Sequence, residues 1–532
     1  MGKNNKQSLL DSSKQENDTP ANSTLLRSGL IVALFTLLSR FFGLAREFFI
    51  AYMFGTSQTA DCVNVAFKFP NLFRRIFGEG ALSSVFIPIY NEKLLTSKLE
   101  AKKFSGEVFT LLFLTLIAIT IVIEILMPYL MILIAPGFYQ DKSKFELAVI
   151  LCRITTPYLI FISITAFFGA ILNSVKKFAA FAFTPVIMNI CIITITYILQ
   201  ENYAAYYGVC YALIAAGILQ VGFMLFCLYR AKLIFKVNFN LNDQSVIKLV
   251  KNMGPATLSS GAQQIGLFIT QSIASFLPGA IAILSYADRL YQLPLALIGI
   301  TFSTILLPEL SQIYKTKNYA RANILQNKAI QVALFVSLPA TFGLLSLSHP
   351  IIHLIYERGQ FTSEDTTATA QVLAWFSLGL PAYILAKIIT LIYYSNLDTK
   401  APMYITFTSL IINIILSIAL MIPFGINGLA AGSSLSAWIN VYLLYIYSKK
   451  YGDFRIIFET KYFAFKAVIA SIIMFCFINI ISFYFSHLYY LDSSIIKIGF
   501  LLGTIMLGIT VFVLFSYLLG IHKVLLIKKQ II

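Results

Sequence analysis

The stretch KFPNLFRRIFGEGALSSVF, residues 68–86, carries four charged side chains inside an apolar run. The rest of the chain is apolar too: 58% of its 532 residues are hydrophobic and 12% are charged. A typical soluble protein has about 25% charged residues, so this composition indicates a polytopic membrane protein. Charges within such a chain need a polar environment. The stretch therefore predicts a membrane helix that lines a wet cavity.

Apolar runs of membrane-spanning length predict an all-α fold with fourteen transmembrane helices. The first 27 residues are polar and lack an apolar core segment, so they predict a disordered cytoplasmic tail rather than a signal peptide. The expected helices lie near residues 28–54, 60–90, 106–135, 146–173, 181–200, 204–228, 247–276, 280–313, 329–356, 366–395, 402–423, 426–447, 462–487 and 493–521.

The distribution of Lys and Arg predicts the orientation in the membrane. In and directly beside the loops on the N-terminal side there are 28 of these residues, against 3 on the other side. Cytoplasmic loops carry the excess of positive charge, so both termini are predicted to be cytoplasmic. The same asymmetry explains the net charge of +17 without a nucleic-acid partner.

The chain also repeats itself. The segment SSVFIPIYNEK at Ser83 matches STILLPELSQIYK at Ser303, and Asn189 aligns with Asn413 within similar flanking sequence. Two parallel-repeat lobes of six helices around a central cavity are expected, followed by two additional C-terminal helices. The predicted domains are the tail at 1–27, lobes at 28–235 and 246–450, and the helix pair at 461–522.

Charged and polar residues inside the expected spans form the candidate cavity surface. At 100° per residue, Asp61, Lys68, Arg75 and Glu79 fall within about 20° of one line. Each Arg facing lipid at mid-span would cost roughly 2.5–3.5 kcal/mol, so these residues should face water, pair with acids, or both. The alternative is that the acids only neutralise the arginines in helix packing. The candidate cavity and gating residues are Ser39, Arg40, Glu47, Asp61, Lys68, Asn71, Arg75, Glu79 and Asp288.

Three arginines are the candidate substrate ligands. From helix positions, Arg46, Arg74 and Arg289 are expected at similar depths in the outer-to-middle part of the membrane. Arg binds phosphate in a bidentate manner, so a phosphate or pyrophosphate is the expected guest. The six cysteines show no zinc spacing, and there is no nucleotide-binding fingerprint, so neither a cofactor nor a metal is predicted.

Three segments together resemble the MurJ (MviN) family of lipid II flippases, within the multidrug/oligosaccharidyl-lipid/polysaccharide exporter superfamily. They are SRFFGLAREFFIAYMFG, TADCVNVAFKFPNLFRRIFGEGALSSVFIPI and SYADRLYQLPLALIGITFSTILLPELS. The resemblance implies a transporter rather than an enzyme. Its implied partners are membrane lipids, the cell-wall synthesis machinery and the substrate lipid II, an undecaprenyl-pyrophosphate-linked disaccharide-peptide. It implies a location in the bacterial cytoplasmic (inner) membrane, where the substrate crosses from the inner to the outer leaflet by alternating access during peptidoglycan biosynthesis. It also implies that the last two helices form a groove for the lipid tail.

Two features depart from the family pattern. The family usually has Asp where this chain has Glu47, and some members use an Asp in a sodium site on the seventh helix, whereas residues 247–276 contain no Asp or Glu. Sodium coupling is therefore not expected. The alternatives are a related exporter of another polyprenyl-pyrophosphate-linked glycan and a multidrug exporter of the same superfamily. The arginine cluster disfavours a cationic drug, and the short outer loops disfavour a membrane glycosyltransferase.

Overall fold

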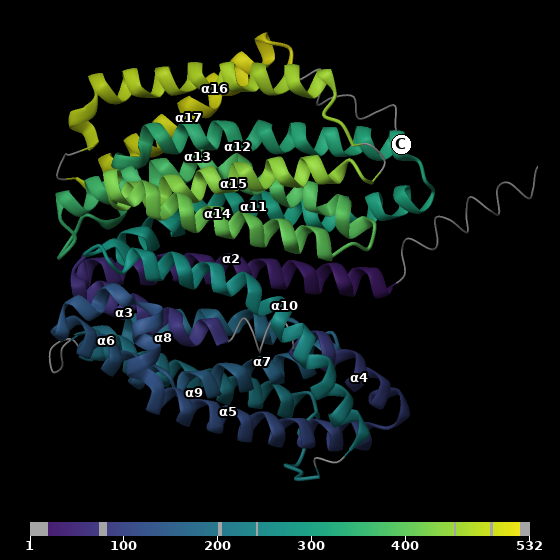
Figure 1. Ribbon diagram of the computed structural model, residues 1–532. Helices are drawn as coiled ribbons and strands as arrows, with labels where there is room; N and C mark the ends of the chain where they lie inside the picture. The colour runs from purple at the N-terminus through teal and green to yellow at the C-terminus, as the bar shows by residue number, and fades with distance from the viewer. Residues whose placement is uncertain are drawn as a thin grey trace, which may run out of the picture. The chain divides into compact units, whose positions relative to one another are not determined.

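The computed structural model describes residues 20–73, 82–199, 205–240, 243–451, 454–489 and 493–521 (Figure 1). Over these residues the secondary structure is helical and contains no strand, which confirms the all-α prediction. The α-helices are α2 (Pro20–Phe54), α3 (Gln58–Phe73), α4 (Ser83–Thr96), α5 (Lys98–Ile134), α6 (Lys142–Thr155), α7 (Tyr158–Ser174), α8 (Ala179–Leu199), α9 (Ala205–Arg230), α10 (Gln244–Ala274), α11 (Ala280–Lys315), α12 (Tyr319–Tyr356), α13 (Ser363–Ser395), α14 (Lys400–Phe424), α15 (Ile426–Ser448), α16 (Phe458–Tyr484) and α17 (Ser494–Leu518), and the short 3-10 helices are η2 (Pro136–Gln140) and η3 (Ser486–Tyr489).

Within the described part of the chain, ten segments are long and apolar enough to cross a membrane. One of them covers residues 142–174. The single helix expected at 146–173 is two helices there, because α6 ends at Thr155 and α7 begins at Tyr158, with Pro157 between them. Proline lacks a backbone N–H and interrupts the helical hydrogen bonds at this point. The expected helix at 60–90 begins as α3 and ends in α4, and residues 74–81 between them lie outside the described ranges.

The chain divides into two compact units. The first contains residues up to 49, then 62–134 and 138–267; the second contains 50–61, 135–137 and everything from 268 onward. Helix α2 therefore contributes its last residues to the second unit, and α10 is divided between the two at residues 267 and 268. The lobe boundaries expected from the sequence stay a prediction.

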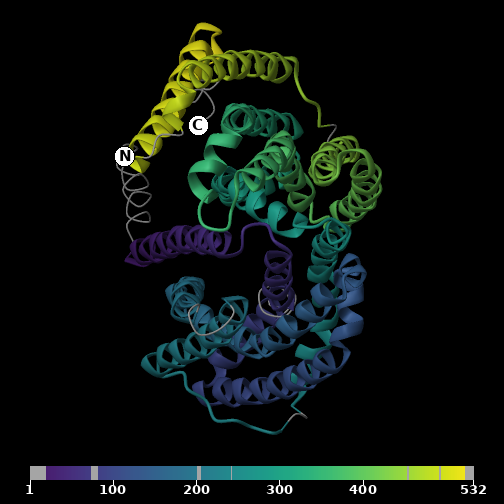
Figure 2. The ribbon, with the colours of Figure 1, turned by 90° about the vertical axis from the view of Figure 1, so that its left-hand side faces the viewer.

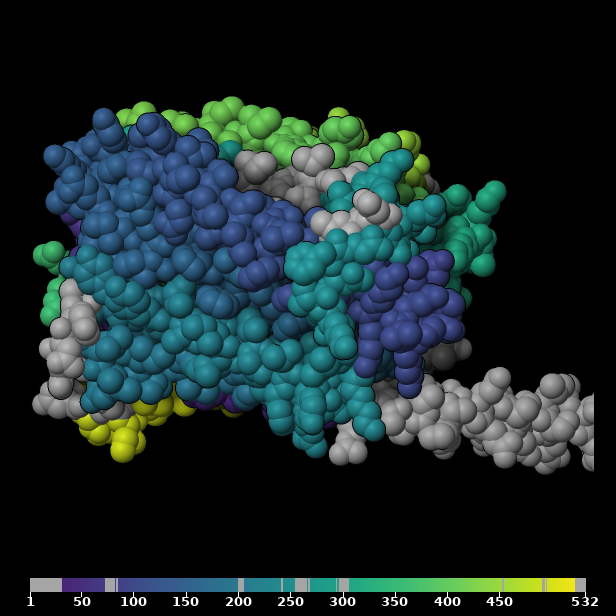
Figure 3. Space-filling view, turned by 90° about the horizontal axis from the view of Figure 1, so that it is seen from below, coloured from purple at the N-terminus to yellow at the C-terminus, as the bar shows by residue number. Residues whose placement is uncertain are grey.

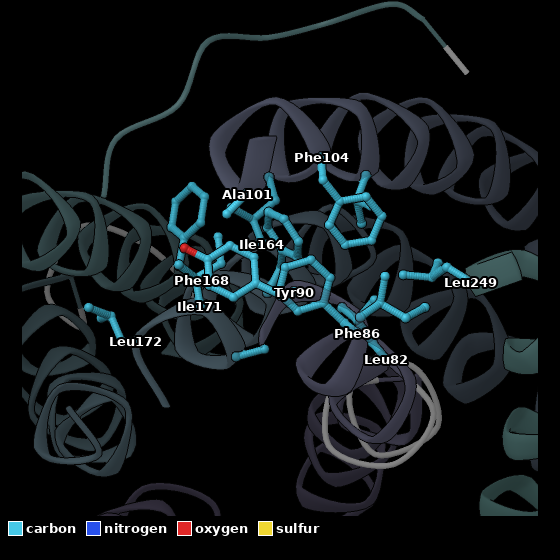
Figure 4. Packing of buried hydrophobic residues seen from close by; sticks show 14 of the residues in the cluster. Leu82, Phe86, Tyr90, Ala101, Phe104, Ile164, Phe168, Ile171, Leu172 and Leu249 are labelled. Atoms are coloured by element: carbon cyan, nitrogen blue, oxygen red, sulfur yellow. The ribbon is translucent and has the colours of Figure 1, made fainter. Parts of the chain in front are cut away.

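The core of the first unit is an aromatic cluster at the junction of α4, α5 and α7 (Figure 4). Phe86 is fully buried, stacks on Phe104 with ring centroids 5.6 Å apart, and meets Phe167 edge-on at 5.1 Å. Offset and edge-on ring pairs of this kind add about 0.5–1.5 kcal/mol each beyond the apolar area they bury. Leu249 of α10 completes the cluster on one side. This core fixes α4 and α7 within the unit.

Small residues let helices of the second unit approach closely. Gly428 of α15 faces α14 so tightly that a Cβ atom there would lie 2.0 Å from the carbonyl oxygen of Leu420. Such small-residue contacts are how helices associate in a membrane, where lipid tails are as apolar as the side chains. The two C-terminal helices, α16 and α17, lie side by side (Figure 2) and pack on α12. Their shared core includes Leu347, Met474 and Phe512.

The outer faces of several helices are apolar. On α5 the exposed side chains include Ile121, Ile125 and Leu133, and on α9 they include Leu219 and Phe226. Figure 3 shows this side of the first unit, where the blue atoms of α5 and the teal atoms of α9 lie at the surface. In a protein whose helices have membrane-spanning length, such faces suit contact with lipid.

Candidate functional site

Arg46 is held inside the first unit by residues from three helices. It lies on α2, is 3% exposed, and donates from Nη1 to Oδ1 of Asn189 on α8 at 3.0 Å. Its Nη2 atom lies 2.5 Å from Oε1 of the neighbouring Glu47, which is also buried. The guanidinium group stands 4.2 Å from the ring centroid of Phe67 on α3. This predicted substrate ligand is thus paired with an acid and oriented by an amide and a ring.

Asn189 connects Arg46 to the backbone of α2. Its Nδ2 atom donates to the carbonyl oxygen of Ser39 at 3.3 Å, while its Oδ1 atom accepts from Arg46. Buried polar groups need partners, because an unsatisfied one costs about 1–3 kcal/mol. The side-chain amide of Asn189 therefore has a defined orientation. It sets the position of the Arg46 guanidinium group relative to the helical turn of α2 that contains Ser39.

A cavity with both polar and apolar lining residues lies beside this cluster. Its volume is about 160 Å³. Gln220 on α9 forms part of the wall, where it donates to the carbonyl oxygen of Thr184 at 2.8 Å and accepts from the hydroxyl of Tyr158 at 3.2 Å. The cavity is lined by Thr36, Ser39, Asn71, Tyr158, Ile162, Ala166, Phe181, Ala182, Thr184, Pro185, Met188 and Gln220.

The charged stripe expected on residues 61–79 is described in part. Lys68 and Asn71 are both half-buried on α3. Asn71 donates from Nδ2 to the carbonyl oxygen of Phe67 at 2.8 Å and lines the cavity. Three members of the predicted set, Arg74, Arg75 and Glu79, lie outside the described residues.

Asp61 is more deeply buried than Lys68 and Asn71, the other described residues of that stripe. Its side chain is fully buried and accepts hydrogen bonds from the backbone N–H groups of Gly279 at 2.9 Å and of Ala282 at 3.0 Å. These amides are at the start of α11, and Gly279 has a φ of +72°, which glycine adopts without strain. A carboxylate at a helix N-terminus satisfies free amides and the helix dipole. Asp61 thus caps α11, and a gating role for it stays a prediction.

The other predicted residues lie on α11 and on α2. Asp288 is half-buried and accepts a hydrogen bond from the side chain of Gln292 one turn later, whereas Arg289 is exposed. Arg40 is exposed on α2, and Ser39 beside it is half-buried at the cavity. Arg46 and Arg289 belong to different compact units, so the convergence of three arginines on one ligand stays a prediction.

Several residues of this site were not singled out from the sequence. They are Phe67, Tyr158, Thr184 and Gln220, together with Asn189, which was noted only as a repeat position. The available signal was weak: Gln220 and Asn189 are polar residues in long apolar runs. Such residues are usually hydrogen-bonded inside a membrane protein, but sequence spacing does not name the partner.

Comparison with known proteins identifies close relatives over almost the whole chain. The model of the family described as lipid II flippase MurJ matches residues 50–500. A protein of Rickettsia prowazekii named probable lipid II flippase MurJ is 54% identical over 498 residues, which cover 94% of this chain and 98% of the relative. A protein of Vibrio cholerae with the same name is 32% identical over 467 residues, covering 86% of this chain and 89% of that one.

Solved structures give the same picture. A structure of lipid II flippase MurJ in an inward closed conformation matches with a TM-score of 0.76 and 31% identity, over 92% of this chain and 98% of that one. An inward-facing multidrug resistance transporter of the MATE family matches with a TM-score of 0.66 over 79% of this chain and 97% of that chain, at 13% identity. The second likeness shows a shared fold alone.

Proposed function

This chain belongs to the MurJ family of lipid II flippases, and we propose that it moves lipid II from the inner to the outer leaflet of the cytoplasmic membrane by alternating access. It is accordingly a multi-pass membrane transporter of a lipid-linked substrate and not an enzyme. At the level of residues, the proposal is supported by the buried Arg46, which Asn189 orients beside a cavity with polar and apolar walls.

The proposed ligand of Arg46 is the pyrophosphate of the substrate, shared with Arg74 and Arg289. An arginine buried in a helix bundle is costly unless it is paired, and Glu47 supplies one acid. Guanidinium groups bind phosphate oxygens in pairs, with charge-assisted hydrogen bonds that are stronger than neutral ones. The proposed cavity and gating residues around this clamp are Ser39, Arg40, Glu47, Asp61, Lys68, Asn71, Arg75, Glu79 and Asp288.

The finer architecture is also proposed. The two lobes are assigned to 28–235 and 246–450, and helices α16 and α17 are assigned to a groove for the polyprenyl tail. Exposed apolar side chains on these two helices, including Phe465, Phe483, Ile480, Leu502 and Met506, support this assignment, because a lipid tail needs an apolar surface. We propose that both termini lie in the cytoplasm and that cell-wall synthesis enzymes are partners of this protein.

Complementation of a bacterial strain depleted of its own lipid II flippase tests the function. The intact chain should restore growth and precursor export. Ala at Arg74 or Arg289 should abolish rescue at normal protein level, and Lys should restore it in part at best, because a point charge does not reproduce the paired contacts of Arg. Arg153 is the matched control: it is exposed on α6, and Arg153→Ala should keep full activity. Full rescue by Arg74→Ala and Arg289→Ala would contradict the clamp.

A further inference from the structure

Residues 231–240, which follow α9, form no helix and run along α5 (Figure 2). Their inward side chains belong to the core of the first unit. Leu233 and Phe235 pack against the aromatic cluster, and the ring centroids of Phe235 and Phe109 are 5.7 Å apart. This segment is therefore a packed part of the unit and not a loose connection.

Two contacts with α5 hold the backbone of the segment in one position. A Cβ atom at Gly106 would lie 2.0 Å from the carbonyl oxygen of Lys236, so glycine lets the segment lie directly on the helix. Asn238 donates from Nδ2 to Oε1 of Glu107 at 3.0 Å, and the Glu107 side chain is fully buried. A buried carboxylate needs such a partner. The side chains that alternate with the packed ones consequently point away from the unit.

The outward face of the segment combines apolar and cationic side chains. Ile234, Val237 and Phe239 are 41%, 56% and 73% exposed. Lys232 and Lys236, which lie among them in the sequence, are exposed as well. Clustered apolar side chains at a surface mark contact with a membrane or a partner, and lysines among them favour an anionic one.

The first turns of α10 have the same character. Leu249 is buried in the aromatic cluster, whereas Ile247 and Val250 are exposed beside the exposed Lys248 and Lys251. A helix with such a mixed apolar and basic face is typical of a membrane surface. We call the exposed side chains of this part of the chain the anchor surface; its members are Lys232, Ile234, Lys236, Val237, Phe239, Ile247, Lys248, Val250 and Lys251.

The anchor surface is strongly positive. Residues 231–251 contain four lysines and one acid, Asp243. That carboxylate accepts a hydrogen bond from the backbone N–H of Ser245 at 2.7 Å, so it caps the start of α10. The charge excess requires an anionic partner. A nucleic acid would use the lysines but would leave the apolar side chains between them in water, whereas a lipid layer uses both.

The backbone sets the depth of the segment in the membrane. Helix α9 is long and apolar enough to cross a membrane, and the segment begins directly after its last residue, Arg230. Irregular backbone does not face lipid inside the hydrocarbon region, because its N–H and C=O groups would lack partners there. Residues 231–240 therefore lie at the level of the headgroups, where lysines reach phosphates and apolar side chains reach the acyl chains.

We propose that the anchor surface binds anionic phospholipids, with its lysines on the phosphate groups and its apolar side chains between the upper parts of the acyl chains. With cytoplasmic termini, these lipids belong to the inner leaflet. The segment connects the two proposed lobes, so the bound lipids hold this connection at the membrane surface during alternating access. The inference does not depend on the identity of the transported substrate.

Quenching of tryptophan fluorescence by brominated lipids tests the proposal on the full-length protein in vesicles. The chain has two tryptophans, Trp375 and Trp438. Replacing both by Phe and adding Phe239→Trp gives a reporter chain whose single tryptophan lies on the anchor surface. The vesicles mix phosphatidylcholine with phosphatidylglycerol, and one of the two carries bromine on its upper acyl chains. The contribution of one lysine near an anionic surface predicts an about 5-fold preference for phosphatidylglycerol.

The preference should come from the lysines. It should fall close to 1 when the four lysines of the anchor surface are replaced by Gln in the reporter chain. It should also fall at high salt, because the Debye length shrinks from about 10 Å at 0.1 M to about 3 Å at 1 M. The matched control changes the charge equally at exposed lysines of the second unit and should keep the preference; its substitutions are Lys315→Gln, Lys400→Gln, Lys449→Gln and Lys461→Gln.

Two results would overturn the proposal. The first is equal quenching of the reporter chain by the two brominated lipids, or a preference that persists without the four lysines. The second is strong quenching by acrylamide, an uncharged quencher dissolved in water, with no quenching by either lipid. The anchor surface would then face water and bind a soluble partner. The salt series uses the reporter chain with its lysines intact, so it detects the charge dependence even if the lysine variant folds poorly.

Discussion

Removing Arg46 should lower both the thermal stability of the protein and its transport activity, and a double substitution separates the two effects. Arg46 Nη2 and Glu47 Oε1 are 2.5 Å apart, and the two side chains are 3% and 5% exposed. Breaking a buried ion pair by removing one partner costs about 3–5 kcal/mol, because the other charge stays buried. At about 2–4 °C per kcal/mol, as for a unit of roughly 200 residues, Arg46→Ala should lower the melting temperature by about 6–20 °C.

The double variant Arg46→Ala/Glu47→Ala removes both charges. Replacing a buried pair by apolar residues is often close to neutral, so most of the lost stability should return. The lost hydrogen bond to Asn189 should leave a deficit of about 1 kcal/mol. Transport should not return, because the proposed phosphate ligand is absent. Comparing the single and double variants thereby separates the loss of transport activity from the loss of stability.

The assays are thermal unfolding in detergent micelles and complementation of a flippase-depleted strain at matched protein levels. Arg153→Ala, at an exposed arginine, serves as the control for both. If the double variant melted as low as Arg46→Ala, the buried pair would not explain the loss of stability. If it complemented fully, Arg46 would serve helix packing and not substrate binding.

Three other predictions concern parts of the chain outside the Arg46 cluster. Single cysteines at Ser143 and Ser97 should react with a membrane-impermeant thiol reagent from outside and inside the cell respectively; the reverse pattern would refute cytoplasmic termini. The hydroxyl of Tyr451 and backbone amides at the start of α14 hold the pKa of Asp398 below its ordinary value. The ionised carboxylate therefore stabilises the fold at pH values above its unfolded-state pKa, and this contribution is lost as the pH falls through the folded-state pKa. Asp398→Asn should lower the melting temperature at neutral pH and flatten its acid dependence, and an unchanged profile would exclude the effect. Gly428→Val should lower the melting temperature strongly, because a Cβ there would lie 2.0 Å from a carbonyl oxygen of α14. An unchanged melting temperature would show that α14 and α15 can move apart at little cost.

The sequence by itself determined the class of protein and the positions of most helices. Long apolar runs predict membrane helices because each span must satisfy its backbone hydrogen bonds internally, so length and hydropathy suffice. They also indicated that arginines inside the spans must face water, pair with acids, or both, since an isolated cation is costly in this environment. The structure shows that Arg46 pairs with Glu47. The motifs around these residues identified the family, which the relatives confirm.

Only the tertiary structure decided which partners these residues have. Asn189, the amide that orients Arg46, is 143 residues away in the chain, and helical periodicity gives the face of a helix but not the side chain opposite it. The same limit applies to Asp61, which shares the angular position of Lys68 yet caps α11 through contacts more than 200 residues distant. The cavity is lined by residues of five helices. The sequence of one helix cannot predict it, because a cavity is the volume that packing leaves between helices.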